Sequence, residues 1–193
     1  MREADERRAD ERMVLGVFNA LTARSGAPLQ YALMTDTPVG PIGLARGEGG
    51  LCRLDFTRDE DAFLTRLLDR FGDRPLLRQP AKLDAVRRQL DRYFSGRSLR
   101  FEVDVDLSAI SGFSRRILEA TARIPAGRVL TYTEVAAKAG SPRASRAAGN
   151  ALHNNPVAII VPCHRIVASS GLGGYGGGIE NKKWLLRHEG VAT

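Results

Sequence analysis

Cysteine is scarce in this sequence: only Cys52 and Cys163 occur among 193 residues. Two thiols so far apart in the chain provide neither a disulfide framework nor a Cys/His cluster with zinc spacing. We therefore expect both to be reduced thiols in a protein of the cytoplasm, and we expect no bound metal.

Long apolar runs are also missing. No stretch approaches the roughly 18 apolar residues that a membrane span requires. Residues 1–12 mix Arg, Asp and Glu without an apolar core, which argues against a signal peptide. The glycine-rich stretch at residues 169–178 lacks the Lys-Ser/Thr ending of a phosphate-binding loop. The sequence thus predicts a soluble intracellular protein with no membrane partner and no cofactor.

The net charge is unevenly distributed along the chain. Residues 1–110 contain 18 Lys and Arg against 18 Asp and Glu, whereas residues 111–193 contain 11 against 4. The whole net charge of +7 therefore lies in the C-terminal part. This asymmetry is typical of a nucleic-acid-binding half joined to a neutral scaffold, although a genome-wide bias toward arginine gives similar compositions.

The N-terminal half is typical of a scaffold. Residues 1–28 are expected to be a helical extension, because apolar side chains recur there at near-helical spacing. Residues 29–105 are expected to form an α/β domain. Its pattern predicts three strands of an antiparallel meander followed by two helices, at residues 29–35, 42–46, 51–56, 59–71 and 81–94. Cys52 alternates with apolar neighbours, so we interpret it as a packing residue.

Residues 106–193 are expected to form a DNA-binding and active-site domain built mainly from helices. A helix at 113–124 is followed by two short helices at 131–139 and 143–152, and a tight turn containing Gly140 joins these two. A short helix pair with such a turn is typical of a helix-turn-helix.

The second helix of this pair is rich in small residues. Ala144, Ala147 and Gly149 leave it almost without long base-reading side chains, apart from Arg146 and Arg143. Small residues allow close approach to a narrow surface, which favours the minor groove of double-stranded DNA over base reading in the major groove. The alternative is that these alanines only pack against another helix.

An apolar run at residues 155–161, short enough for a buried strand, leads to Pro162-Cys163-His164-Arg165. A thiol reacts as a thiolate, and histidine is the usual acceptor of its proton. Because Cys163 and His164 are chain neighbours, their side chains would point to opposite faces of an extended strand. Either Pro162 bends the chain or a water carries the proton between them. A core cysteine beside a surface histidine is the alternative.

A carboxylate would complete a set of nucleophile, base and orienting group. Glu189, Glu134 and Glu180 are the candidates, and spacing alone does not choose among them. Since a free thiol has a pKa of about 8.5, activation near neutral pH is a modest requirement.

From about Tyr31 to Gly190 the sequence resembles the O6-alkylguanine-DNA alkyltransferases, also called methylated-DNA–protein-cysteine methyltransferases. Six segments match in order and at the family's spacing: Thr131-Tyr132, Asn155-Pro156, Pro162-Cys163-His164-Arg165, Gly174-Tyr175, Lys182-Lys183-Trp184-Leu185-Leu186 and His188-Glu189-Gly190. The resemblance implies an α+β fold. A small antiparallel-sheet domain of the ribonuclease H-like type would precede a mainly helical domain with a winged-helix-like helix-turn-helix.

The implied function is DNA repair by direct, irreversible and stoichiometric transfer of an alkyl group to a cysteine of the protein. The substrate would be O6-alkylguanine, with O4-alkylthymine as a further candidate, in a base flipped out of the duplex. We expect a monomer of bacterial type that is associated with the nucleoid when it is bound to DNA. Relatives that bind lesions without repair have tryptophan in place of the cysteine, so Cys163 implies competence for transfer.

The resemblance also implies a role for each catalytic residue. Cys163 would accept the alkyl group, His164 would act as a base through a water, and Glu189 would hold His164. Asn155 matches the hinge asparagine between the helix-turn-helix and the active site. Tyr132 matches the tyrosine that donates to the guanine ring as negative charge develops.

Other matching residues are implied to bind DNA or the flipped base. Arg146 matches the finger that enters the base stack and offsets part of an unstacking cost of a few kcal/mol. Tyr175 and Gly176 match the loop that lines the base pocket, and the carbonyl of Ile166 would accept from the guanine amino group. Lys182 belongs to the family signature without a specific implied contact.

Two further hypotheses fit parts of the pattern. One is a helix-turn-helix protein that senses lesions or regulates transcription without transfer, with Cys163 as a structural residue. The other is a cysteine hydrolase that uses the thiol, the histidine and a carboxylate.

Overall fold

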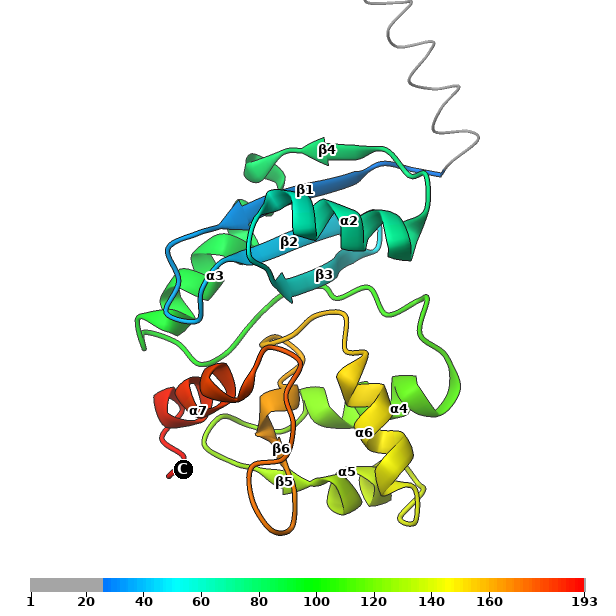
Figure 1. Cartoon of the computed structure of the whole chain (residues 1–193), viewed down its shortest axis with the longest axis vertical. Coiled ribbons are helices and arrows are strands. Elements are labelled where there is room, and N and C mark those ends of the chain that lie inside the picture. The colour runs from blue at the N-terminus through cyan, green and yellow to red at the C-terminus, as the bar shows by residue number, and fades with distance from the viewer. Residues whose placement is uncertain (1–25, 193) are drawn as a thin grey trace, which may run out of the picture.

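The computed structural model describes residues 26–192, in which an N-terminal sheet lies against a helical C-terminal half (Figure 1). The helical extension expected at the N-terminus falls almost entirely outside these residues. Within the described range, no helix is long and apolar enough to cross a membrane. Nor do three or more His, Cys, Asp or Glu side chains come together there as a group that could hold a metal ion.

The sheet contains four strands in the order β3-β2-β1-β4. Their bounds are Leu29–Met34 for β1, Ile42–Gly47 for β2, Gly50–Phe56 for β3 and Leu76–Arg78 for β4. The predicted antiparallel meander is confirmed for the first three strands, with Tyr31 opposite Ala45 and Leu44 opposite Leu54. A fourth strand, β4, was not predicted and pairs parallel with β1. Three residues are too few to show an alternating pattern in the sequence.

Helices cover the two faces of this sheet. On one face, α2 (Glu60–Phe71) packs Phe63 against the backbone of Gly43 so closely that a Cβ there would lie 2.3 Å from the ring. Cys52 is buried in the same cluster and behaves as a packing residue. On the other face lie the 3₁₀ turn η1 (Pro80–Leu83) and α3 (Asp84–Phe94). Leucines on both faces bury apolar surface, and each Å² removed from water stabilises the fold by roughly 25 cal/mol.

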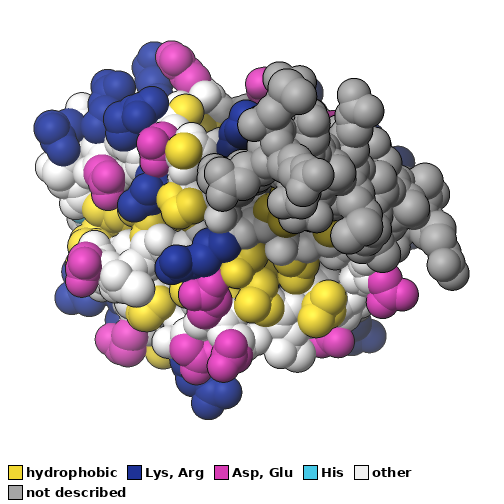
Figure 2. Space-filling model, turned by 90° about the horizontal axis from the view of Figure 1, so that it is seen from above, with side chains coloured by type: hydrophobic (Ala, Val, Ile, Leu, Met, Phe, Trp, Pro, Cys, Tyr) yellow, Lys and Arg dark blue, Asp and Glu magenta, His cyan; other side chains and the backbone are white. Residues whose placement is uncertain are grey.

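The surface of the sheet end carries charges of both signs. Seen from that end, Lys and Arg side chains alternate with Asp and Glu side chains rather than forming a patch of one sign (Figure 2). This mixture agrees with the balanced charge of residues 1–110.

The C-terminal half is built around three helices, α4 (Gly112–Ala122), α5 (Tyr132–Lys138) and α6 (Ser145–His153). A capping box of Thr131 and Glu134 begins α5, since each side chain accepts from the other residue's backbone N–H. Gly140, with φ of 79°, makes the turn between α5 and α6. The short parallel pair β5 (Leu130–Thr131) and β6 (Ile166–Val167) was not predicted, and α7 (Ile179–His188) closes the chain.

The apolar run at residues 155–161 is not a strand, so that prediction was wrong. The run forms consecutive turns that touch β3 at one bridge, where Leu54 donates to the Pro156 carbonyl at 2.8 Å and accepts from Ala158 at 3.2 Å. Ile159 adopts a φ of 70°, which a β-branched residue rarely does. The run is apolar because it is buried between the two halves, and an apolar run alone does not distinguish a strand from packed turns.

Candidate active site

Cys163 begins a short 3₁₀ turn, η2 (Cys163–Arg165), directly after Pro162. Asn155 fixes this turn from the end of α6. Its amide nitrogen donates to the Cys163 sulfur at 3.1 Å and to the Val161 carbonyl at 2.8 Å, while its amide oxygen accepts from the Val157 N–H at 3.1 Å. Asn155 therefore connects the end of α6 with the turn that carries the thiol.

His164 is fully buried, and its Nε2 lies 2.9 Å from Oε1 of Glu189. Glu189 is thus the carboxylate that meets the histidine, since Glu134 caps α5 and Glu180 pairs with Lys183 at the surface. Burial lowers the pKa of His164 although Glu189 opposes this shift, so the ring is neutral at pH 7. Within residues 26–192, its Nδ1 has no hydrogen-bond partner, and no hydrogen bond joins the ring to the thiol.

Two further residues hold Glu189, and the sequence analysis assigned a role to neither. Arg165 donates its Nε to Oε2 and a terminal nitrogen to Oε1, both at 2.8 Å. Tyr93 of α3 donates its hydroxyl to Oε1 at 2.7 Å from the N-terminal half. Burial would raise the pKa of Glu189, but the hydrogen bonds from His164 and Arg165 outweigh it and hold that pKa well below its usual range. Arg165 could have been considered from the sequence because it follows His164 in the motif, whereas no sequence pattern marks Tyr93 as a residue of the site.

The thiol of Cys163 is less acidic than the sequence analysis assumed. Burial raises its pKa, while the hydrogen bond from Asn155 and the charge of Lys182 only partly oppose this effect. The expectation that activation is a modest requirement is therefore corrected. At neutral pH the protein holds a thiol beside a neutral imidazole, and the proton has to leave as the sulfur reacts.

Lys182 is completely buried, which is rare for a lysine. Its ammonium donates to the carbonyls of Ile166 and Leu172, both at 2.5 Å, and of Gly174 at 3.2 Å. Burial lowers its pKa to about 8. Lys182 therefore fixes the glycine-rich loop from within. The Ile166 carbonyl, expected to face guanine, already accepts one bond from Lys182 and keeps a second lone pair.

A small cavity of about 190 Å³ opens beside the thiol. It is lined by Tyr132, Gly149, Leu152, His153, Cys163, Gly174, Tyr175 and Gly176. Burial raises the pKa of Tyr132, so its hydroxyl remains a hydrogen-bond donor. The buried hydroxyl of Tyr175 has no hydrogen-bond partner among the described residues. The cavity thus joins the thiol to most of the residues expected to surround a base, but Ile166 does not line it.

The small residues of α6 lie on different faces of the helix. Arg146 and Ala147 are exposed, and Ala144 and Gly149 are half-buried. Ala148, Ala151 and Leu152 are buried against the helical core. The exposed face therefore presents one arginine among small residues.

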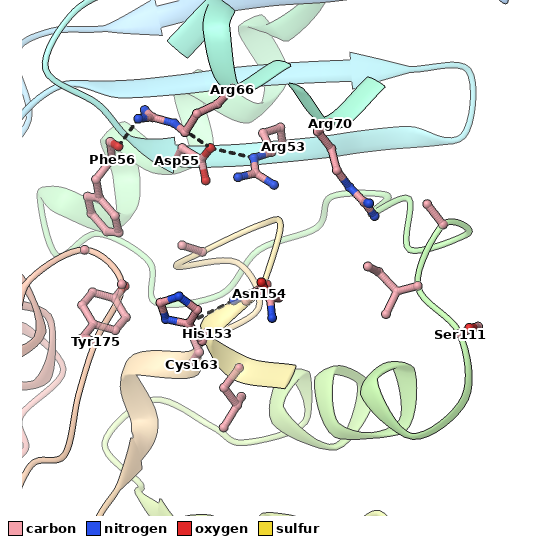
Figure 3. A pocket seen from close by; sticks show the side chains of 17 residues that line it. Arg53, Asp55, Phe56, Arg66, Arg70, Ser111, His153, Asn154, Cys163 and Tyr175 are labelled. Carbon is pink, nitrogen blue, oxygen red and sulfur yellow. Dashed lines mark hydrogen bonds and ion pairs between the residues drawn. The ribbon is translucent and has the colours of Figure 1, made fainter. Parts of the chain in front are cut away.

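A second cavity of about 660 Å³ lies between the two halves and shares Cys163 with the first (Figure 3). From the C-terminal half it is bordered by the end of α6 and by Tyr175. From the N-terminal half it is bordered by Phe56 and by three arginines, Arg53, Arg66 and Arg70, with Asp55 between the first two. The N-terminal half therefore provides part of the lining of this cavity.

Comparisons with known proteins agree with this geometry. The family model described as the 6-O-methylguanine DNA methyltransferase ribonuclease-like domain matches residues 29–107, and the one described as the DNA binding domain of the same enzyme matches residues 112–191. The methylated-DNA–protein-cysteine methyltransferase of Methanosarcina barkeri is 38% identical over 160 residues, which cover 82% of this chain and 96% of the relative.

Solved structures are similar as well. The crystal structure of the Mycobacterium tuberculosis O6-methylguanine methyltransferase is 36% identical, with a TM-score of 0.71, and the match covers 83% of this chain and 92% of that one. The structure of Mycobacterium tuberculosis OGT in complex with DNA has the same identity and coverage, with a TM-score of 0.69.

Proposed function

The chain belongs to the 6-O-methylguanine DNA methyltransferase family, and we propose that it repairs DNA by moving the alkyl group of O6-alkylguanine irreversibly onto its own Cys163. Its activity is that of a methylated-DNA–protein-cysteine methyltransferase, and DNA is its partner. The position of Cys163 supports its assignment as the acceptor of the alkyl group. Cys163 borders the small cavity, is held by Asn155 at 3.1 Å, and adjoins the pair of His164 and Glu189.

The reaction follows from these positions. The flipped base enters the small cavity, and the Cys163 sulfur attacks the carbon attached to O6. A sulfur–carbon bond forms as the carbon–O6 bond breaks, and the electron pair of the broken bond stays on guanine. A water relays the thiol proton to neutral His164, while Tyr132 donates to the ring as negative charge develops. Guanine takes up the proton donated by Tyr132 and leaves neutral, and the proton held by His164 returns through solvent to Tyr132. The thioether is not hydrolysed, so each molecule reacts once.

Binding is proposed to occur through the minor groove of double-stranded DNA. The exposed face of α6 supports this, because small residues surround Arg146 and allow the helix to approach closely. Arg146 would fill the place of the extruded base and offset part of an unstacking cost of a few kcal/mol. The phosphate contacts make affinity fall with salt and depend little on sequence.

We propose that the protein acts as a monomer in the cytoplasm, with nucleoid association when DNA is bound. All residues that meet the thiol come from one chain, so a second copy is not needed to complete the site. A reaction that consumes a free thiol also requires the reducing conditions of that compartment.

The test uses duplex DNA labelled in the O6-methyl group. Wild-type protein should take up at most one equivalent of label, and Cys163→Ala should take up none. Cys52→Ala is the matched control, because Cys52 is the other thiol and lies buried against α2 with a pKa raised to about 11. It should retain full uptake.

Three outcomes would contradict the proposal. Uptake by Cys163→Ala equal to that of wild type would place the acceptor elsewhere. DNA binding without uptake would indicate a lesion-sensing or regulatory protein, and turnover of acyl substrates beyond one equivalent would indicate a hydrolase. A panel that includes O4-methylthymine then defines which bases are accepted.

A further inference from the structure

We propose that the arginines of the N-terminal half form an anion-binding wall that favours transfer of negatively charged alkyl groups, such as the carboxymethyl group of O6-carboxymethylguanine. This inference rests on the proposed function, because it concerns which alkyl groups reach Cys163. It assigns a specificity role to Arg53, Arg66 and Arg70, three residues of the sheet domain that the reaction described above does not use.

The thiol stands at the junction of two cavities. The cavity of about 190 Å³ contains Tyr132 and accommodates the base, whereas the cavity of about 660 Å³ lies toward the N-terminal half. Cys163 and Tyr175 line both of them. A substituent on the carbon under attack has to extend away from the base. The larger cavity provides far more room in that direction than a methyl group needs.

The far wall of the larger cavity is positively charged. This wall contains three arginines and a single aspartate, Asp55, whose Oδ2 lies 2.6 Å from Nε of Arg53 and 3.4 Å from Nε of Arg66. One carboxylate does not neutralise three guanidinium groups, so an excess of positive charge remains. Figure 3 shows the guanidinium group of Arg53 directed from β3 toward the side on which Cys163 lies, whereas that of Arg70 extends toward the side of Ser111.

Arg53 has the geometry to bind a carboxylate. Its side chain is only 19% exposed and is held at Nε by Asp55, which leaves both terminal nitrogens directed away from the strand. Within residues 26–192, neither terminal nitrogen donates a hydrogen bond. Two parallel N–H groups of one guanidinium match the two oxygens of a carboxylate.

Charge explains why such a wall would affect the rate. The sulfur gains negative charge as its proton leaves, and a carboxylate on the carbon under attack repels it in this partly buried space. Cations on the opposite side of the alkyl group offset that repulsion. The step itself is balanced as before: sulfur bonds to the methylene carbon, the carbon–O6 bond breaks, and the products are S-carboxymethylcysteine and neutral guanine.

The test compares three lesions in the same duplex: O6-methylguanine, O6-carboxymethylguanine and its neutral isostere O6-carbamoylmethylguanine. The readout is the ratio of the single-turnover rates for the carboxymethyl and carbamoylmethyl lesions, with adducts on Cys163 measured by mass spectrometry. The two groups have the same shape, so the ratio isolates the charge. We expect the ratio to fall about tenfold in Arg53→Gln, a loss typical of a charge-assisted hydrogen bond.

Two more variants keep the test decisive. Arg70→Gln changes an exposed side chain in the last turn of α2 that can be replaced without loss of the fold, and it should lower the ratio about two- to threefold. Arg58→Gln removes the same charge from an exposed position that does not line the cavity, and it should leave the ratio unchanged.

The proposal is overturned if the ratio is the same in wild type, Arg53→Gln and Arg70→Gln. A fall of all three rates by one common factor overturns it too, because it would mean that the arginines bind a DNA phosphate. Failure of the proposed function looks different: wild-type protein would then not react with the O6-methyl lesion at all.

Discussion

Tyr93 donates its hydroxyl hydrogen to Oε1 of Glu189 at 2.7 Å, across the boundary between the two halves of the molecule. Both side chains are buried, and the same carboxylate oxygen faces His164. The carboxylate that orients the imidazole is therefore held from the N-terminal half as well as from Arg165. In this way α3, which provides no reacting group, helps to fix the orientation of His164 beside the thiol.

The first prediction concerns this hydrogen bond. Tyr93→Phe removes the hydroxyl but keeps the ring that packs against Phe94 and Phe101. The carboxylate loses one donor, so we expect the free energy of unfolding to fall by about 1 to 3 kcal/mol. The single-turnover rate of alkyl transfer should fall as well, because the orientation of His164 relaxes. Urea denaturation and quench-flow transfer measure the two effects.

Tyr31→Phe is the matched control for this change. Tyr31 also donates its hydroxyl to a glutamate, Glu60, at 2.8 Å, but on the sheet and α2. We expect a smaller loss of stability, about 0.5 to 1.5 kcal/mol, and an unchanged transfer rate. Equal loss of rate in both variants would show that Tyr93 acts only through stability.

The second prediction concerns the donor to the thiol. Asn155→Asp preserves the shape of the side chain and the acceptor for the Val157 N–H, but it replaces the donor to the Cys163 sulfur with a negatively charged acceptor. A like charge beside the sulfur raises the pKa of the thiol further. We expect the transfer rate at pH 7 to fall about tenfold or more. The rate measured from pH 6 to pH 9 should show its rise displaced toward higher pH.

Asn154→Asp adds the same charge one residue earlier, at an exposed side chain that bonds only the Asn150 carbonyl. Its effect on the rate should be much smaller, since solvent screens an exposed charge. If the two variants were slowed equally, a direct role for the amide at the sulfur would be untenable.

The third prediction concerns the buried lysine. Lys182→Met fills similar volume but leaves the carbonyls of Ile166, Leu172 and Gly174 without their donor. Unsatisfied buried carbonyls cost stability, so we expect a loss of about 2 to 4 kcal/mol in urea denaturation. Transfer should slow because the glycine-rich loop carries the wall of the base cavity.

Lys183→Met supplies the comparison within the same helix. The side chain of Lys183 is 39% exposed and pairs with Glu180 three residues earlier. A surface pair of this kind contributes little, so the change in stability should stay within about 0.5 kcal/mol. A Lys182→Met protein as stable and as fast as Lys183→Met would show that the carbonyl contacts are dispensable.

Sequence patterns predicted most of the secondary structure here because the amphipathic helices and alternating strands repeat over several turns or residue pairs. α2 and the first three strands fall within one residue of their predicted bounds, whereas α3 begins three residues later than predicted, because Pro80–Leu83 form the 3₁₀ turn η1. β4 and β5 were missed because two or three residues do not show a period. The run at 155–161 was misinterpreted because burial by tertiary contacts, not by strand pairing, makes it apolar.

The candidate site was predictable to the extent that its residues cluster in the chain or match the family. Cys163, His164 and Asn155 are near neighbours in sequence, and the structure brings them together with Glu189. Tyr93 was not predictable, because an aromatic residue in an amphipathic helix is usually a core residue. Only the fold brings its hydroxyl into contact with Glu189, which lies 96 positions further along the chain. The raised pKa of the thiol was equally hidden, since burial is a property of the fold.

The last prediction concerns acid stability. Hydrogen bonds from His164 and Arg165 outweigh burial and hold the pKa of Glu189 below its ordinary value of 4.5, which it regains on unfolding. Below about pH 4.5 the unfolded chain therefore binds more protons at this site than the folded chain, and the free energy of unfolding falls as the pH falls toward the folded pKa. Glu189→Gln has no such titration. It should be less stable than wild type by about 3 to 5 kcal/mol at pH 7, because Arg165 loses its buried partner.

The difference between the two proteins should therefore shrink steadily between pH 5 and pH 3, when both are unfolded in urea at each pH. Glu180→Gln is the control on the same helix, where the carboxylate is exposed and pairs only with Lys183. Its difference from wild type should stay small throughout this range, since solvent screens the pair. A Glu189→Gln difference that remained constant from pH 7 to pH 3 would show that folding does not lower the pKa of the Glu189 carboxyl. The buried ion pair of Glu189 and Arg165 would then not be the source of the stability difference between wild type and Glu189→Gln.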